Sequence, residues 1–596
     1  MPETLKTDWR VTKNGTDLGE YLRQLEDAEV IAIDTEGTGL KVRDLRDHAT
    51  GIGTTIKVNG KLSSHFFPFR FSVGFNYNSR CLEELRRILQ KTTKRTVFHN
   101  ALYDLPALRT LGINIPTSPI LYDTMLISSL VNENWPLNRS LDSLAFNYLG
   151  LNKVEKTWRD EDWAWIPADV MYEYAVWDPE VTYMVWEHEW QKVEQIGLHR
   201  YWEEHKSDTI HSFDLLMQTG VQIDESFCER KLYEGSDVMA DVTELLGGKP
   251  TGAHLKKILL DELGLPVVKT TPNGRPSFDK EAMQEYDVIL QRVDNPIAEW
   301  VKAYRGWEKA TSSMFKAYLD NMSPDGRLRT NYMLHKAAEG GDAGGTVTGR
   351  VSSRNPNLQQ IPRNSSNPWN GDTKKAFKAS DGMLGFEIDY SQLELRLGTH
   401  YAQDAALIDA FEHGRDVFTE MAKELGMPRH EVKTMVYSIQ YGAGLQRLMN
   451  VFGINKAQAA DRKLGFFGQY PGFKSAIDLA TREAFATKRV KIWSGRYRNF
   501  ANVKAEAHKA FNSRIQGGAA DIVEVALNQI VKEVIIPSDG AVRVMLQIHD
   551  AFCFEAERSV AESAKKQIAA IMTGVGNGFF RAKFDVDTHD WGSNGN

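Results

Sequence analysis

The stretch FEIDYSQLELR, residues 386–396, joins a predicted strand to a predicted helix. Residues 383–388 are mostly apolar and predict a short buried strand, and the pattern after Asp389 becomes helical. A carboxylate at the carboxyl end of a buried strand is well placed to hold a metal ion. The alternative is that Asp389 only caps the helix that follows it.

A second stretch, RHEVKTMVYSIQYG at residues 429–442, predicts a helix with one chemically distinct side. Arg429, Lys433, Tyr437 and Tyr441 recur every four residues, so they form a slowly drifting stripe along that helix. Two cations followed by two aromatic rings suit a ligand with a polyphosphate end and a flat end. The alternative is a solvated basic turn followed by a half that faces the core.

A third stretch, VMLQIHDAFCFE at residues 544–555, has two apolar runs on either side of His549 and Asp550. Such a pattern predicts a β-hairpin that carries a carboxylate at its turn. Asp389 and Asp550 could then share metal ions.

The three stretches together resemble motifs A, B and C of the family A (DNA polymerase I-like) DNA polymerases, in the order of that family. The resemblance implies an α+β right-hand polymerase domain with palm, fingers and thumb, which adds dNTPs to a primer 3′ end. It implies two Mg²⁺ ions, or Mn²⁺, held by Asp389 and Asp550. It also implies the nucleotide-binding residues Tyr390, Glu394, Arg429, Lys433 and Tyr437, with Glu394 as the steric gate against a ribose 2′-OH.

The run TGRVSSRNPNLQQIP, residues 348–362, resembles another segment of these polymerases. The resemblance implies that Arg350 contacts the minor groove at the primer terminus, where all correct pairs share the same acceptors. It implies four further DNA contacts, by Tyr441, Asn512, Gln516 and His549. Residues 344–351 nearly spell a phosphate-binding Walker A loop, but Arg350 and Val351 stand where Lys and Ser or Thr are needed, so an ATPase is excluded.

The chain departs from the polymerase pattern at three positions. Ala551 follows Asp550 where the family usually has Glu, and Phe418 stands where it has a phosphate-contacting His. Tyr437 stands where many bacterial members have Phe. In the family this Tyr accompanies tolerance of dideoxynucleotides, and we expect the same here.

Residues 30–36, VIAIDTE, form an apolar run that closes in Asp-x-Glu. Side chains alternate along a strand, so Asp34 and Glu36 would share one face. Two carboxylates that project together repel each other unless a cation lies between them. The alternative is an exposed strand end.

Two further pairs, Asn100 with Asp104 and Tyr174 with Asp178, are each spaced by one helical turn. Taken singly, these residues fit capping and packing. With Asp34 and Glu36 they resemble the motifs of the DEDDy 3′–5′ exonucleases. The resemblance implies an α/β, RNase H-like domain in which two divalent metals are bound by four acids and Tyr174 orients the attacking water. The four acids are Asp34, Glu36, Asp104 and Asp178.

The totals are those of a soluble globular protein with several domains. The chain has 596 residues, 42% of them hydrophobic and 25% charged, and a net charge of −7, which argues against a wholly electrostatic, histone-like binder. Three widely spaced cysteines, Cys81, Cys228 and Cys553, exclude a disulfide scaffold and a multi-cysteine zinc site. No run has membrane-spanning length and residues 1–8 lack a targeting pattern, so we expect a cytoplasmic protein.

The resemblances predict an exonuclease domain at residues 1–205 and a polymerase domain at residues 206–596. Within the latter we expect the thumb at about 206–345, the palm at about 346–410 and 500–596, and the fingers at about 411–499. Because the first exonuclease motif begins at Asp34, we expect no 5′ nuclease domain and a phage-type layout, with work in the host cytoplasm. Expected partners are primer–template DNA and dNTPs, with a processivity factor, a helicase–primase and a single-strand-binding protein as further candidates and no membrane.

Three other functions fit parts of the sequence. A single-subunit RNA polymerase shares the palm chemistry, but Glu394 and the exonuclease motifs argue against it. A polymerase with a silent exonuclease conflicts with the complete set of exonuclease motif residues. A non-catalytic DNA-binding module finds support only in Ala551 and Phe418. Seven tryptophans between Trp158 and Trp202 fit helix packing better than a base-stacking platform.

Overall fold

The computed structural model describes residues 15–44, 46–91, 94–117, 120–156, 158, 165–335, 346–361, 373–576 and 579–591. Gly344 and Pro362 of the motifs above lie outside these ranges, as does Trp163, one of the seven tryptophans between Trp158 and Trp202. The chain forms two compact units. The first contains Met1–Thr219, Thr330–Arg354 and Glu387–His589, and the second contains Gly220–Arg329, Asn355–Phe386 and Asp590–Asn596.

The amino-terminal part of the first unit is built on a five-stranded sheet in the order β3-β2-β1-β4-β5. Its central strand β1 is antiparallel to β2 and parallel to β4. Ile31 and Ile33 of β1 are fully buried, as the apolar run predicts. The strands are β1 (Val30–Gly37), β2 (Ala49–Val58), β3 (Lys61–Pro68), β4 (Arg95–Phe98) and β5 (Leu121–Asp123).

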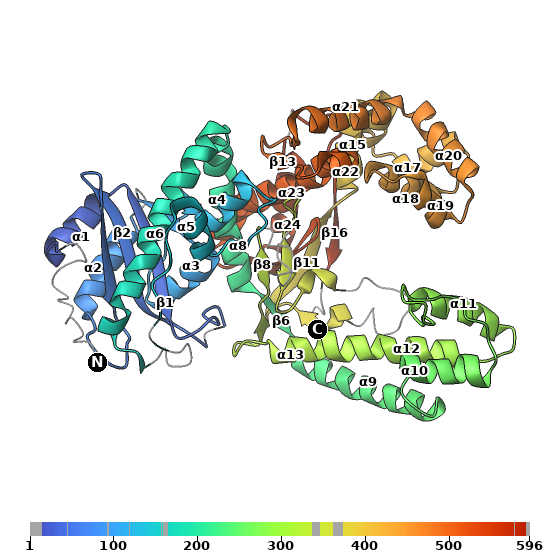
Figure 1. Cartoon of the computed structure of the whole chain (residues 1–596), viewed down its shortest axis with the longest axis horizontal. Coiled ribbons are helices and arrows are strands. Elements are labelled where there is room, and N and C mark those ends of the chain that lie inside the picture. The colour runs from blue at the N-terminus through green and yellow to red at the C-terminus, as the bar shows by residue number, and fades with distance from the viewer. Residues whose placement is uncertain are drawn as a thin grey trace. The chain divides into compact units, whose positions relative to one another are not determined.

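Helices surround this sheet, and the long helix α6 (Ala168–Gln195) packs on β1, β2 and β3 (Figure 1). Gly53 of β2 permits the close approach, because a Cβ at that position would lie 2.4 Å from the carbonyl oxygen of Ala175. The approach sets the height of α6 over β1. The other helices here are α1 (Leu18–Asp27), α2 (Ser79–Leu89), α3 (Ala101–Thr110), α4 (Thr124–Val131), α5 (Leu141–Leu149), α7 (His199–Tyr201) and α8 (Ser207–Thr219).

A second sheet, in the order β14-β15-β11-β16, carries the predicted polymerase acids. The strand after Phe377–Lys378 (β10) is β11 (Met383–Tyr390), which ends one residue beyond Asp389. Strands β14 (Val542–Ile548) and β15 (Ala551–Glu557) form the predicted hairpin, and the pairing of Ile548 with Ala551 leaves His549 and Asp550 as its turn. The fourth strand is β16 (Val586–Asp590).

The helices of this half surround the second sheet and continue into the predicted fingers. The helix after Asp389 begins at Leu393, with Gln392 at its N-cap position, so Asp389 is not its cap. The helices are α15 (Leu393–Ala402), α16 (Ala405–Glu412), α17 (Val417–Leu425), α18 (Arg429–Gln440), α19 (Leu445–Phe452), α20 (Lys456–Gln469), α21 (Pro471–Thr487), α22 (Val503–Glu506), α23 (Ala510–Ile530) and α24 (Ala561–Gly574). This half of the first unit also contains the short strands β8 (Asn331–Met333), β9 (Ser352–Arg354), β12 (Arg489–Lys491) and β13 (Tyr497–Asn499).

The second unit is dominated by two helices that lie side by side, α9 (Glu225–Leu245) and α12 (Ile297–Ala310) (Figure 1). Their apolar faces share a core with α10 (Gly252–Leu255) and α11 (Lys280–Gln291). Gly235 permits the crossing, because a Cβ there would lie 2.7 Å from the Trp307 ring. The remaining elements are α13 (Lys316–Asp320), β6 (Val221–Ile223) and β7 (Arg327–Leu328).

None of the helices in the described ranges combines the length and the apolar character that a membrane crossing requires.

Candidate active sites

Three carboxylates meet between β1 and α6. Oxygen atoms of Asp34, Glu36 and Asp178 all lie within 4.8 Å of one another. Asp34 and Glu36 are two apart on one strand, so they point to the same face, and Asp178 reaches them from the helix above. The spacing of the sequence motifs therefore brings these three acids together as predicted.

Asp104, the fourth predicted acid, lies beside this group but is engaged elsewhere. Its Oδ1 accepts hydrogen bonds from the Thr35 backbone N–H at 3.0 Å and from the Thr35 hydroxyl at 2.7 Å. Asn100 precedes α3 with a left-handed backbone, φ 72°, so it is not on the helix with Asp104. The expectation that Asn100 and Asp104 share one helix face is therefore wrong, because the helix starts one residue too late.

Burial dominates the electrostatics of these acids. It raises the pKa of Glu36 to about 8, with a further contribution from the charge of Asp178. Burial likewise raises the pKa of Asp104 to about 8 and that of Asp34 well above its ordinary value. Within the described ranges, Glu36 Oε1 is buried and accepts no hydrogen bond. Clustered carboxylate oxygens with an unsatisfied acceptor fit a hard divalent cation such as Mg²⁺ or Mn²⁺.

Tyr174 and Asp178 lie one turn apart on α6, and a lysine outside all predicted motifs contacts both. The Lys153 Nζ lies 3.2 Å from Asp178 Oδ1 and 4.7 Å from the centroid of the Tyr174 ring. Lys153 comes from the segment after α5, and no spacing in the sequence ties it to the other residues. Only the packing of that segment against α6 identifies it.

The two predicted polymerase acids lie at the ends of neighbouring strands of the second sheet. Asp389 is the last residue but one of β11, and Asp550 immediately precedes β15. The Tyr390 N–H, next to Asp389, donates to the Asp550 carbonyl oxygen at 3.4 Å. Burial raises the pKa of Glu394 and of Tyr437, and the negative charge of Asp550 adds to both shifts. The three side chains therefore lie close enough to interact electrostatically. Two carboxylates on adjacent strand ends fit a divalent cation site.

Glu394, in the first turn of α15, contacts two other predicted site residues. Its side chain is 7% exposed and forms an ion pair with Arg350. Its other oxygen accepts a hydrogen bond from the Tyr441 hydroxyl at 2.5 Å. Arg350 and Tyr441, both expected to contact DNA, are thus held on the residue expected to select the sugar.

The stripe on α18 follows the predicted order of two cations and two aromatic rings. Arg429 and Lys433 are exposed, and the rings of Tyr437 and Tyr441 lie 6.2 Å apart. Phe418 of α17 is buried beneath them, with its centroid 6.0 Å from that of Tyr437.

Phe418 also lies close to both cations of the stripe. The Arg429 guanidinium and the Lys433 ammonium are 5.7 Å and 5.9 Å from its ring centroid. Arg429 Nε donates in addition to Asp416 Oδ2 at 2.7 Å. Asp416 itself caps α17, so a single capping residue links the two helices at the cationic end of the stripe.

Asn512 and Gln516 lie one turn apart on α23, both half-buried. Asn512 Oδ1 accepts no hydrogen bond within the described part of the chain. Arg496, which no motif predicted, joins α23 to the loop of Arg350: its Nη2 donates to the carbonyl oxygens of Thr348 at 2.7 Å and Gly517 at 3.0 Å.

The side chain of Tyr390, predicted to bind the nucleotide, points away from the site, and Glu555 of β15 does not join it. The Tyr390 side chain is 3% exposed and its hydroxyl donates to the Met572 carbonyl oxygen at 2.8 Å, so this side chain cannot contact a nucleotide. Its alternation along β11 turns it away from Asp389 and into the core. Glu555 is fully buried beside Arg543, 3.3 Å from it, and does not replace the acid missing at Ala551.

The tryptophans of α6 and its surroundings are mostly packing residues. Tyr122 contacts the rings of Trp186, Trp190 and Trp202, and Trp202 is fully buried. Trp165, in contrast, is 69% exposed. The packing interpretation therefore holds for the three tryptophans around Tyr122.

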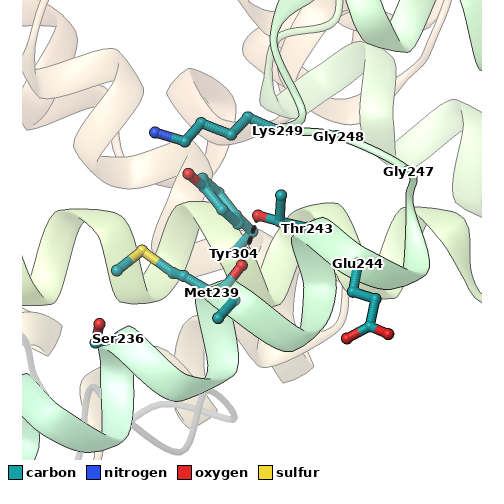
Figure 2. Close-up of a pocket in the computed structure, with 9 residues that line it drawn as sticks. Ser236, Met239, Thr243, Glu244, Gly247, Gly248, Lys249 and Tyr304 are labelled. Carbon is teal, nitrogen blue, oxygen red and sulfur yellow. Dashed lines mark hydrogen bonds between the residues drawn. The ribbon is translucent and has the colours of Figure 1, made fainter.

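A shallow hollow of about 630 Å³ lies in the second unit at the end of α9. It is bordered by residues 247–249 and by Tyr304 of α12 (Figure 2). None of the residues that line it is a predicted site residue. The chemistry-bearing residues of the sequence motifs lie instead in the first unit.

Two family models match the chain. The model described as DNA polymerase family A matches residues 240–593, and the model described as 3′-5′ exonuclease matches residues 10–194. The two matches cover the two groups of acids described above.

Named relatives and a solved structure agree with these matches. DNA polymerase I of Pseudomonas aeruginosa is 28% identical over 612 residues, covering 96% of this chain and 64% of that protein. The thermostable DNA polymerase I of Thermus aquaticus is 30% identical over 383 residues, 60% of this chain and 44% of that protein. The structure of the POL domain of Pol1 from M. smegmatis, in complex with DNA primer-template and dNTP, shares the fold: TM-score 0.81, 22% identity, 96% of this chain and 97% of that one.

Proposed function

Because the chain belongs to DNA polymerase family A, we propose that it extends a DNA primer with dNTPs on a template and proofreads the new end with its 3′–5′ exonuclease domain. The chain spans 64% of the length of the P. aeruginosa relative, so activity, substrates and partners are proposed here on the chain's own residues. The observation that carries the proposal is the backbone hydrogen bond from the Tyr390 N–H to the Asp550 carbonyl oxygen, which brings the residue next to Asp389 against Asp550.

In the polymerase site, Asp389 and Asp550 would hold two Mg²⁺ ions, for which Mn²⁺ could substitute. When bound, such ions align a primer hydroxyl with the α-phosphate and stabilise the charge of the leaving oxygen. Arg429 and Lys433 bind the triphosphate, the first as a bidentate donor and the second as a point charge. Tyr437 lies next in the stripe and faces the sugar and base.

Glu394 selects deoxyribonucleotides by occupying the space that a ribose 2′-OH needs. Its burial and its two partners support this role, because Arg350 and Tyr441 hold the carboxylate in one place. A fixed group rejects an added hydroxyl more strongly than a mobile one. The same burial disfavours an RNA polymerase, which must accept that hydroxyl.

Arg350, Tyr441, Asn512, Gln516 and His549 are the proposed DNA contacts. Asn512 and Gln516 share one face of α23, and the unsatisfied Asn512 Oδ1 suits a hydrogen-bond donor of a base. Arg496 holds the Arg350 loop against that helix. The primer–template would therefore meet one connected group of polar side chains.

In the exonuclease site, Asp34, Glu36, Asp104 and Asp178 would hold the divalent ions. When bound, these ions supply an activated water and stabilise the leaving 3′ oxygen. Tyr174, above Asp178 on α6, orients the water toward the terminal phosphate. The raised pKa values of the acids mean that binding of a cation must displace protons.

The domain limits given above are part of this proposal, as are its setting and partners. We place the protein in DNA replication in the cytoplasm, with primer–template DNA and dNTPs as substrates. The compact layout favours a phage enzyme, although the relatives named above are bacterial. A processivity factor, a helicase–primase and a single-strand-binding protein are the candidate partners.

The test uses a 5′-labelled primer on a longer template with Mg²⁺, run with and without dNTPs. Elongation with dNTPs and shortening without them would support both activities in one gel. Shortening under both conditions would mean that Ala551 or Phe418 has abolished polymerase chemistry, and the polymerase proposal would then fail.

A further inference from the structure

Lys153 is the cation that most closely approaches the exonuclease acids among the contacts above. Its Nζ lies 3.2 Å from Asp178 Oδ1 and 3.4 Å from Asp178 Oδ2, and it reaches Asp142 Oδ1 of α5 at 3.5 Å. The Lys153 and Asp178 side chains are 26% and 12% exposed, so water screens this pair less than it screens the pair with the exposed Asp142. Lys153 therefore ties the first turn of α5 to the middle of α6.

The same ammonium contacts Tyr174. It lies 4.7 Å from the centroid of the tyrosine ring. A second lysine, Lys156, lies 5.4 Å from that centroid. Helical spacing places Tyr174 and Asp178 on one face of α6 but leaves the tyrosine χ angles undetermined, and a charged donor between the two side chains removes that freedom.

We propose that Lys153 is a positioning residue of the exonuclease site: its ammonium contacts both the Tyr174 ring and the Asp178 carboxylate and offsets part of the charge of the buried acids. The inference rests on the proposed exonuclease function and adds a residue that none of its motifs contains. Lys153 orients Tyr174 toward the water and Asp178 toward the cation. In the metal-free protein it also supplies positive charge that a bound divalent ion later supplies.

The first test is kinetic and uses the full chain on short single-stranded DNA at saturating Mg²⁺. Lys153→Met should lower kcat by about tenfold with little change in KM, the usual cost of losing a group that orients a metal-site residue. Lys153→Arg should keep most of the activity because it keeps the charge. Lys192→Met is the matched control, since it removes another half-buried ammonium of the same domain, 4.4 Å from the Tyr148 ring.

A double-mutant cycle separates positioning from a general structural effect. Lys153→Met should lower kcat by a smaller factor in a Tyr174→Phe background, because the part of its effect that acts through the tyrosine is already lost there. Equal fold-losses in both backgrounds would overturn the proposal. So would a loss of the same size in the Lys192→Met control.

The second test does not depend on activity. The background carries Asp389→Asn and Asp550→Asn, so that the polymerase site does not contribute to metal binding. Thermal unfolding is followed in EDTA and in Mn²⁺, and the transition that Mn²⁺ shifts is recorded. In Lys153→Met the acids lose their counter-charge. Adding Mn²⁺ should therefore raise the Tm of this variant by about 4 °C or more beyond the rise seen in the same chain with Lys153 intact.

Lys153→Arg and Lys192→Met should show the gain of the unchanged chain. An equal gain for Lys153→Met would overturn the proposal. If the unmodified protein does not degrade DNA, the exonuclease function fails, and the Tm comparison still decides whether Lys153 balances the charge of the acids.

Discussion

Phe418 stands where the polymerase sequence pattern predicts a phosphate-contacting His, and its ring lies close to both cations of the α18 stripe. We infer that the ring holds Arg429 and Lys433 in place rather than binding phosphate itself. Each cation over a ring contributes about 0.5–1 kcal/mol at an exposed site. Phe418→Leu should therefore raise the KM for dNTPs about fivefold and change kcat little.

Steady-state incorporation of a single nucleotide measures this effect. Phe452→Leu is the matched control in the fingers, because Arg462 lies 5.0 Å from its ring centroid outside the stripe. An unchanged KM in Phe418→Leu, or the same rise in the control, would contradict the role of the ring.

Tyr437 carries the second prediction at the scale of one residue. In the polymerases that the chain resembles, a tyrosine at this position accompanies the use of ddNTPs, so we expect the Tyr437 hydroxyl to replace the missing 3′-OH and the protein to use ddNTPs readily. Tyr437→Phe should lower the ratio of ddNTP to dNTP incorporation by about tenfold or more, the value of one hydrogen bond to a charged group. Competition between ddNTP and dNTP on one template measures the ratio. Strong rejection of ddNTPs by the unmodified protein that no change at Tyr437 alters would refute the idea.

At the scale of elements, β1 and α6 bury the exonuclease acids close together, and this makes the stability of the fold depend on pH. Burial raises the pKa of Glu36 and of Asp104 to about 8, above their ordinary values of 4.5 and 3.8. A carboxyl group whose pKa is raised by folding stabilises the fold at pH below its unfolded pKa, and that contribution is lost as pH rises through 8. In EDTA the Tm of this unit should therefore fall between pH 6 and pH 9.

Thermal unfolding in EDTA at several pH values measures the fall. Glu36→Gln should reduce it by roughly 3 °C or more, because one of the titrating groups is gone. The control Glu187→Gln changes an exposed carboxylate of α6 that pairs with Lys57. Identical pH slopes for Glu36→Gln and the unmodified protein would contradict the assignment of the pKa values.

The α9–α12 crossing in the second unit depends on Gly235. A Cβ there would lie 2.5 Å from Thr311 Cγ2 and 2.7 Å from Trp307 Cε3. Overpacking of this kind typically costs about 1–3 kcal/mol. Gly235→Val should therefore speed trypsin cleavage within residues 220–329 about tenfold, with the cut sites located by mass spectrometry. Gly252→Val, where no atom lies within 4 Å, should not, and equal digestion of both variants would exclude this packing role.

At the scale of the molecule, the exonuclease acids and the polymerase acids belong to one compact unit but gather at two different sheets. We expect the two activities to be separable. Asp389→Asn should abolish extension and leave degradation, and the pair Asp34→Ala with Glu36→Ala should do the reverse. The labelled-primer gel measures both, and loss of both activities from the single palm change would contradict two independent sites.

The two parts of the first unit are nevertheless joined by buried polar contacts. Arg498 Nη1 of β13 lies 3.1 Å from Glu133 Oε1, and Asn134 Nδ2 donates to the Asn499 carbonyl oxygen at 2.7 Å. Lys206 and Glu524 pair at 2.8 Å. We still expect the two proposed activities to be separable, although their sites are carried by one packed unit.

The fold class, the order of the two matched regions and much of the local geometry could be predicted from the amino-acid sequence. The strand before Asp389, the α18 stripe and the hairpin turn at Asp550 all follow from periodicity over a few residues, which the backbone enforces locally. The same holds for Asp34 with Glu36 and for Tyr174 with Asp178. The predicted fold class is confirmed by the family matches and by the structural likeness.

The contacts between side chains far apart in the sequence could not be predicted and became visible in the folded chain. Arg350 and Tyr441 converge on Glu394 from 44 and 47 residues away, and Lys153 reaches Asp178 from another element. The structure also turned the Tyr390 side chain into the core and bound Asp104 to Thr35. Such contacts depend on how elements far apart in the chain pack, and periodicity within one element carries no information about that packing.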